Sequence, residues 1–132
     1  MPRILILDDE PLICMMMQDW LGELACEAVG PVHAAGLALV LVKETPVDCA
    51  LIDLSLKDGP SYAVASALRE RGIPFAFVTG HGEHLLDPAF KEVVVLRKPI
   101  EFERFKDVVG QLVAMRQRHL VPPSSPGANV AV

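Results

Sequence analysis

The sequence has no long apolar run and no excess of basic residues. Its most apolar stretch, residues 34–42, is far shorter than the roughly 18 residues that a membrane-spanning helix needs. Only residues 4–7 separate the opening Met-Pro-Arg from three acids, which is too short for the apolar centre of a signal peptide. A formal net charge of -5 and a pI near 5.3 argue against a nucleic-acid partner, because such proteins carry clustered basic side chains. We therefore expect a cytoplasmic protein that binds neither membranes nor nucleic acids.

Cysteine is scarce as well. The three residues Cys14, Cys26 and Cys49 lack the C-x-x-C spacing of metal and redox sites, and each lies within an apolar segment. We expect three buried thiols in a reducing compartment. The run HGEH at residues 81–84 has no cysteine or third histidine nearby, which favours a polar loop over a metal site.

The chain is long and apolar enough for one domain with a single core, since 52% of its 132 residues are apolar and 22% are charged. We assign residues 1–119 to this domain. Residues 120–132 are rich in Pro, Ser and Gly and show no periodicity, so we expect a disordered tail there.

Short apolar segments bounded by polar turns alternate with longer segments of helical spacing. Residues 49–53 are apolar up to Asp53 and predict a strand that is buried on both faces, hence central and parallel. Residues 27–32 contain a Gly-Pro pair, which favours an edge strand. The alternation predicts an α/β fold, a doubly wound sheet of five parallel strands with helices on both faces. The predicted strands are residues 3–7, 27–32, 49–53, 75–78 and 93–97, and the predicted helices are residues 11–25, 35–43, 61–71 and 101–118, with at most a short helix at 87–92.

Two of these helices have unusually apolar sequences. The methionine run at residues 15–17 places only Met16 squarely on the predicted apolar face, and we interpret the run as packing rather than as a metal site. Residues 35–43 also fit a strand by periodicity, but the strand–helix alternation favours a helix in which some Leu or Val faces outward and marks a contact surface. The predicted face of the first helix consists of Leu12, Ile13, Met16, Trp20, Leu21 and Leu24.

Five polar residues follow the apolar runs of four different strands: Asp8, Asp9, Asp53, Thr79 and Lys98. Because ligand sites of open α/β sheets lie beyond the carboxyl ends of the strands, we expect these side chains to meet in one crevice. Three carboxylates repel one another unless a cation neutralises them, and oxygen ligands favour Mg²⁺. With an ammonium and a hydroxyl added, the set predicts a cradle for a phosphoryl group in transfer to Asp53.

At these positions the sequence resembles the receiver domain of two-component response regulators, over residues 3–119. That family has an acidic pair after its first strand, an aspartate at the end of the third, a Thr or Ser at the end of the fourth, and a Lys-Pro pair after the fifth. The resemblance implies a flavodoxin-like strand order 2-1-3-4-5. The corresponding runs here are LDDE with Asp8 and Asp9, IDLS with Asp53, VTG with Thr79, and RKP with Lys98 and Pro99.

The resemblance also implies a chemistry. Asp53 would accept a phosphoryl group from the phosphohistidine of a sensor histidine kinase or a histidine phosphotransfer protein. Asp9, Asp53 and the backbone carbonyl of Ser55 would bind Mg²⁺, with Asp8 acting through water. The peptide bond before Pro99 is usually cis in the family.

The sequence departs from the family pattern in two places. Val95 stands where the family usually has an aromatic residue whose rotation reports phosphorylation. The run FAFVTGHG looks like a subgroup of stand-alone receivers with a Thr-Gly-aromatic run, but here His81 follows Gly80 in place of the aromatic. The segment between the threonine and the lysine also looks shorter than usual.

Several functions compete for this pattern. The leading hypothesis is a single-domain phospho-receiver that signals by phosphorylation-dependent protein binding, or drains phosphate from a kinase. Its main rival is a scaffold that keeps the fold without being phosphorylated. An aspartyl-nucleophile phosphatase would need an Asp-x-Asp after the central strand, and a flavin module would need a phosphate-cradling loop after the first strand; both motifs are missing.

Overall fold

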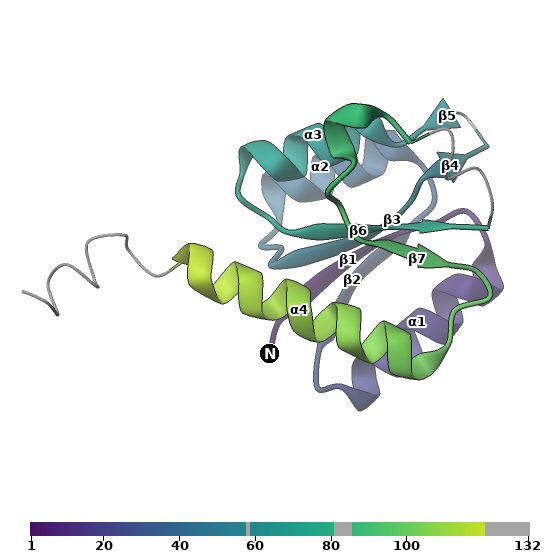
Figure 1. The fold of residues 1–132 in the computed structure, drawn as a ribbon, viewed down its shortest axis with the longest axis vertical. Helices are drawn as coiled ribbons and strands as arrows, with labels where there is room; N and C mark the ends of the chain where they lie inside the picture. The colour runs from purple at the N-terminus through teal and green to yellow at the C-terminus, as the bar shows by residue number, and fades with distance from the viewer. Residues whose placement is uncertain (58, 81–85, 121–132) are drawn as a thin grey trace, which may run out of the picture.

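Five parallel strands form the sheet at the centre of the molecule (Figure 1). The computed structural model describes residues 1–57, 59–80 and 86–120. The strand order β2-β1-β3-β6-β7 confirms the predicted flavodoxin-like arrangement and places the second strand at an edge. The strands are β1 (Arg3–Leu7), β2 (Glu27–Val32), β3 (Cys49–Asp53), β6 (Phe75–Thr79) and β7 (Val95–Arg97).

Helices α1 (Pro11–Glu23) and α4 (Phe102–Leu120) cover one face of this sheet, and α2 (Ala35–Glu44) and α3 (Tyr62–Glu70) cover the other (Figure 1). The core therefore has two layers. Alternate residues of β1 point to opposite faces: Leu5 and Leu7 join the layer that α2 and α3 cover, whereas Ile4 and Ile6 join the layer that α1 and α4 cover. Every residue of β3 is buried, as predicted for a central strand.

The predicted apolar face of α1 is wrong in part. The residues that the helix buries are Cys14, Met17 and Leu21. Leu12, by contrast, is 79% exposed, and Met16 is only partly buried. The first half of α1 is apolar on every side, so its sequence fits more than one stripe, and packing against the sheet selects among them.

Helix α2 confirms the preference for a helix over a strand. It buries only Ala38 and Val42 fully, and Leu37 and Val40 remain exposed, as expected for a helix that is apolar nearly all round. No helix in the described part of the chain combines the length and apolarity that crossing a bilayer would require.

The connection after β3 is more regular than the predicted turn. Two short antiparallel strands, β4 (Ser55–Leu56) and β5 (Gly59–Pro60), form a small hairpin before α3. Gly59 has a φ of +123°, a value that suits only glycine.

The segment before β7 differs from the prediction in detail. The short helix expected at residues 87–92 is a single 3-10 turn, η2 (Pro88–Phe90), capped by the side chain of Asp87. The amide of Val93 donates to the carbonyl of Phe90 at 3.0 Å, which keeps this residue in the turn. As a result β7 begins at Val95, opposite Phe77, and not at residue 93.

The cysteines agree with the prediction, since all three are free and buried. Burial raises the pKa of Cys14 to about 11 and that of Cys49 to about 12, so neither thiol is reactive at neutral pH.

Helix α4 continues to Leu120, a residue that the composition of the sequence places in the predicted tail. Residues 121–132, where we predict disorder, lie outside the described residues.

Candidate functional site

The carboxyl ends of β1, β3, β6 and β7 meet at one edge of the sheet, and four of the predicted residues lie there. Leu7 is in register with Ile52 and Asp53 with Val78, so the residues that follow these strands become neighbours. Asp8, Asp53 and Thr79 are all buried. Charged and polar groups are rarely buried without a partner or a task, so this edge is the candidate site.

Lys98 is the positive group of this cluster. Its Nζ lies 3.2 Å from Oδ2 of Asp8 and 3.4 Å from Oδ2 of Asp53. The shortest contact, 2.6 Å, is to Oε1 of Glu10, a residue that the sequence motifs do not assign to the site. Burial alone would lower the pKa of Lys98, but the hydrogen bond to Glu10 and the charges of Asp53 and Asp8 outweigh it and raise the pKa. The ammonium is therefore charged at any physiological pH.

Asp8 is held on one oxygen and lacks a hydrogen bond on the other. Its Oδ1 accepts a hydrogen bond from the amide of Glu10 at 2.9 Å. Its Oδ2 is buried and accepts none, because the contact to Lys98 does not have hydrogen-bond geometry. Burial raises the pKa of Asp8, and Lys98 opposes this shift. A buried carboxylate oxygen that has an ion pair but no hydrogen bond fits a site built for a cation.

Contacts to both carboxylate oxygens and to the backbone carbonyl hold Asp53 in position. Oδ1 accepts from the amide of Ser55 at 3.1 Å, and Oδ2 faces Lys98. The hydroxyl of Ser61, also buried, donates to the backbone carbonyl of Asp53 at 2.6 Å. Burial first, and the charge of Asp8 second, raise the pKa of Asp53 to about 6. The sequence carries no signal for Ser61 beyond its place at the start of a predicted helix.

The donor set matches a hard divalent cation. Single oxygens of Asp8, Glu10 and Asp53 all lie within 4.8 Å of one another. Carboxylate-only sites of this kind suit Mg²⁺. Asp9, predicted as a direct ligand, makes a different contact: its Oδ2 accepts a hydrogen bond from the amide of Lys57 at 2.7 Å. Its role in metal binding, like that of the Ser55 carbonyl, stays a prediction.

Two further predicted positions border the cluster. The Lys98–Pro99 peptide bond is cis, as the resemblance implies, and so is Gly30–Pro31, for which the sequence gives no signal. Gly80 is exposed at the end of β6, where a Cβ atom would lie 3.9 Å from the side chain of Lys98. His81 lies outside the described residues.

An aromatic cluster lies beside the position where the family's aromatic is missing. Phe90 stacks on Tyr62 with ring centroids 5.5 Å apart, and Phe77 of β6 meets both rings edge-on. The guanidinium of Arg69 lies 4.4 Å from the centre of the Phe90 ring. This cluster links β6, α3 and the segment that leads to β7, whereas Val95 itself is a small, half-buried residue.

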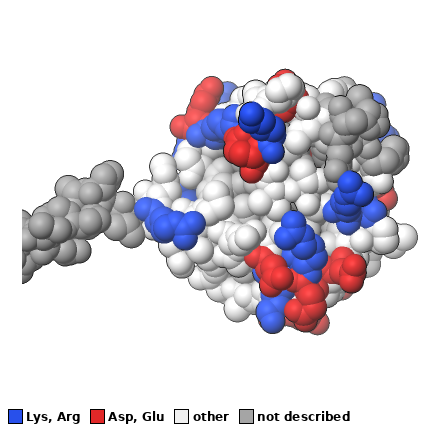
Figure 2. All heavy atoms as spheres, viewed as in Figure 1, with Lys and Arg blue, Asp and Glu red and all other residues white. Residues whose placement is uncertain are grey.

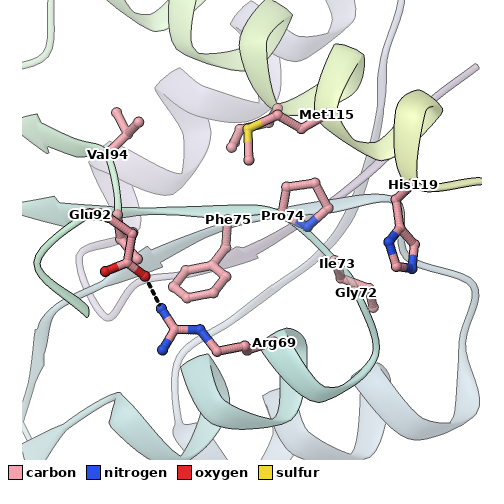
Figure 3. Close-up of a pocket in the computed structure, with 11 residues that line it drawn as sticks. Arg69, Gly72, Ile73, Pro74, Phe75, Glu92, Val94, Met115 and His119 are labelled. Carbon is pink, nitrogen blue, oxygen red and sulfur yellow. Dashed lines mark hydrogen bonds and ion pairs between the residues drawn. The ribbon is translucent and has the colours of Figure 1, made fainter. Parts of the chain in front are cut away.

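A separate cavity of about 390 Å³ lies at the opposite end of the sheet (Figure 3). Its walls come from the end of α3, the start of β6, the residues before β7 and α4. Met115 and His119 lie on the α4 side, and Arg69 and Glu92 form an ion pair at the rim (Figure 3). The cavity shares no residue with the acidic cluster.

Charge on the face shown in Figure 2 is mixed. Lys and Arg side chains stand in small groups beside Asp and Glu, with uncharged surface between the groups. The described residues on this face therefore form no continuous basic stripe of the kind that follows a phosphate backbone.

The chain is similar to signalling proteins along most of its length. The family model described as response regulator receiver domain matches residues 4–109. The phyllosphere-induced regulator PhyR of Methylorubrum extorquens is 29% identical over an alignment of 123 residues, which covers 87% of this chain and 45% of that protein. The chain therefore spans about half the length of this curated relative.

Solved structures extend this similarity. SdrG from Sphingomonas melonis Fr1 is 38% identical with a TM-score of 0.74, and the match covers 89% of this chain and 97% of SdrG. PhyR from Brucella abortus is 28% identical with a TM-score of 0.79, and the match covers 90% of this chain and 50% of that one. Since the family match spans most of the chain and the fold and acidic edge agree with it, this protein belongs to the response regulator receiver domain family.

Proposed function

We propose that this receiver takes a phosphoryl group on Asp53 from the phosphohistidine of a sensor histidine kinase or a histidine phosphotransfer protein. The supporting observation is the carboxylate of Asp53, which is buried at the end of the central strand with an ammonium 3.4 Å from one oxygen. The Ser55 amide holds the other oxygen. The carboxylate is thus held in a fixed position beside an ammonium that can neutralise the oxygens of an incoming phosphoryl group.

The proposed transfer needs charge neutralisation more than acid–base chemistry. An oxygen of Asp53 forms a bond to phosphorus while the phosphorus–nitrogen bond of the donor breaks. The donor imidazole, which carries a proton on its other ring nitrogen, keeps the electron pair of the broken bond and leaves as the neutral ring. Aspartyl phosphate carries a charge of about -2 where the Asp53 carboxylate carried -1, and it would lie beside the buried carboxylate of Asp8. Lys98 supplies one positive charge, and Thr79, at the end of β6, supplies a hydroxyl as donor.

The residues also fit a Mg²⁺ ion. Asp53, Asp9 and the Ser55 carbonyl would hold it, with Asp8 acting through water. The observation that supports this is the buried Oδ2 of Asp8, which accepts no hydrogen bond. When bound, Mg²⁺ would neutralise the phosphoryl oxygens and the carboxylates at the same time. Without it, Lys98 is shared among the carboxylates of the cluster.

We propose a signalling role in the cytoplasm, where free buried thiols stay reduced. The output is a change in which protein the receiver binds, or the removal of phosphate from a kinase. The relative SdrG has been solved in a BeF3-activated conformation, so a beryllofluoride probe is suited to this fold. The rival scaffold function is favoured by one observation, the small Val95 at the position of the family's aromatic.

Intact mass after incubation with acetyl phosphate separates the two functions. We expect the wild-type chain to gain the mass of one phosphate in the presence of Mg²⁺ and much less in EDTA. The Asp53→Asn variant should gain none, since the proposed acceptor carboxylate is gone. A wild-type chain that stays unmodified under both conditions would leave the scaffold as the better description, and modification of the Asp53→Asn variant would show that another residue is the acceptor.

A further inference from the structure

Lys98 makes its closest contact with a residue that the proposed transfer does not use. Its Nζ lies 2.6 Å from Glu10, against 3.2 Å from Asp8 and 3.4 Å from Asp53. An ammonium has three donors, and distances below about 3 Å mark the strong charge-assisted hydrogen bonds. The lysine is therefore held best by the carboxylate that lies outside the buried pair.

The backbone of Glu10 is held in place, which directs its side chain. Its amide donates to Oδ1 of Asp8 at 2.9 Å. It is the N-cap residue of α1 with extended dihedral angles, and Pro11 after it restricts those angles further. Its carboxylate makes no capping hydrogen bond to the helix, so it is available to Lys98.

Exposure distinguishes Glu10 from the other two carboxylates. Its side chain is 57% exposed, whereas that of Lys98 is 11% exposed. A carboxylate in water gives up an ion pair at little cost, because solvent replaces the lost contact. Glu10 can therefore hold the ammonium in the unmodified protein and release it when a stronger anion arrives.

We propose that Glu10 is a positioning residue that holds Lys98 over the site and competes for it with the phosphoryl group on Asp53. The inference rests on the proposed function and adds a residue that regulates how tightly the phosphoryl group is held. While Asp53 is unmodified, the ammonium is shared with Glu10. A phosphoryl group must draw Lys98 away from Glu10, so this contact sets how tightly the site holds a phosphoryl anion.

The direct test measures beryllofluoride affinity by amide NMR titration at saturating Mg²⁺. Glu10→Gln removes the competing charge, and we expect about two- to fivefold tighter binding, the range of a partly exposed ion pair. Glu101→Gln is the matched control, because it removes the same charge from an exposed residue three positions beyond Lys98. Tighter binding in the first variant but not in the second supports the proposal. Equal affinities in wild type and Glu10→Gln, or equal gains in both variants, overturn it.

A second measurement tests the contact without any phosphoryl mimic. The ε-methylene NMR signals of Lys98 should shift in Glu10→Gln and stay in place in Glu101→Gln. Unchanged Lys98 signals in Glu10→Gln would overturn the proposal even if beryllofluoride bound more tightly.

Two outcomes distinguish a failure of the proposed function from a failure of the role of Glu10. A wild-type chain that binds no beryllofluoride and takes no phosphate from acetyl phosphate would refute the phospho-receiver, and the competition with it. A wild-type chain that does both, with a Glu10→Gln variant indistinguishable from it, refutes only the role of Glu10.

Discussion

The hydroxyl of Ser61 donates a 2.6 Å hydrogen bond to the backbone carbonyl of Asp53, across the hairpin that separates them. Ser61 is fully buried. The bond joins the two ends of the connection between β3 and α3, and it thereby holds the end of the central strand in place.

Removing this hydroxyl should cost stability. Ser61→Ala leaves the buried carbonyl of Asp53 without this donor, and we expect a loss of about 1–2 kcal/mol in the free energy of unfolding. Urea denaturation measures it. Ser66→Ala, which changes an exposed serine on α3, is the control and should stay within about 0.5 kcal/mol. Equal stabilities of the two variants would show that the Ser61 bond contributes nothing.

The raised pKa of Asp53 predicts a pH-dependent stability of the metal-free protein. The pKa is about 6 in the folded chain against an ordinary value of 3.8, so between these values the folded state binds more protons than the unfolded state. Stability should therefore fall as pH rises from about 4 to above 6. Asp53→Asn removes the part of this dependence that comes from Asp53 and should stabilise the protein by about 1–3 kcal/mol at pH 7.5 but much less at pH 4.5.

Thermal unfolding in EDTA at the two pH values checks this prediction. Added Mg²⁺ should stabilise the wild type more than the Asp53→Asn variant, since the ion relieves the same repulsion. A variant that is less stable than wild type at pH 7.5 without metal would contradict the expected direction.

The predicted role of Asp9 can be tested by metal titration. Asp9→Ala should weaken Mg²⁺ binding by about tenfold or more, because it removes a predicted ligand. It should leave the fold intact, since the carboxylate's hydrogen bond to the Lys57 amide is exposed. Asp19→Ala, an exposed acid on α1, controls for the lost charge. An unchanged titration would remove Asp9 from the coordination shell.

Phosphorylation should be read out in the segment after β6, since Val95 offers no aromatic ring to rotate. A phosphoryl group draws Thr79 and Lys98 toward it, and Gly80 lies against the side chain of Lys98. We expect amide hydrogen exchange across residues 80–86 to slow when beryllofluoride binds. Exchange that changes on another surface alone would refute this.

His81, in the same segment, should tune the lifetime of the phosphoryl group. The prediction comes from its position two residues beyond the threonine, since the side chain lies outside the described residues. The measurement is the rate at which phosphorylated wild type and His81→Ala lose phosphate. Identical rates would dismiss the role of this side chain.

The sheet and most of the site follow from the order of residue types along the chain. A short apolar run is typical of a buried parallel strand, and the carboxyl ends of such strands meet at one edge whatever their side chains are. The polar residues that follow these runs, Asp8, Asp53, Thr79 and Lys98, are therefore predictable as neighbours from the chain alone.

Packing in three dimensions decides which of several equivalent groups makes each contact. The first half of helix α1 is apolar on every side, and only its packing on the sheet selects Cys14 and Met17 over Leu12. Three consecutive acids follow β1, and only the direction in which each side chain leaves the backbone places Glu10 on Lys98 and Asp9 on the Lys57 amide. The physical reason is the same in both cases: local sequence specifies residue type and period, whereas contacts depend on side-chain direction in a packed interior.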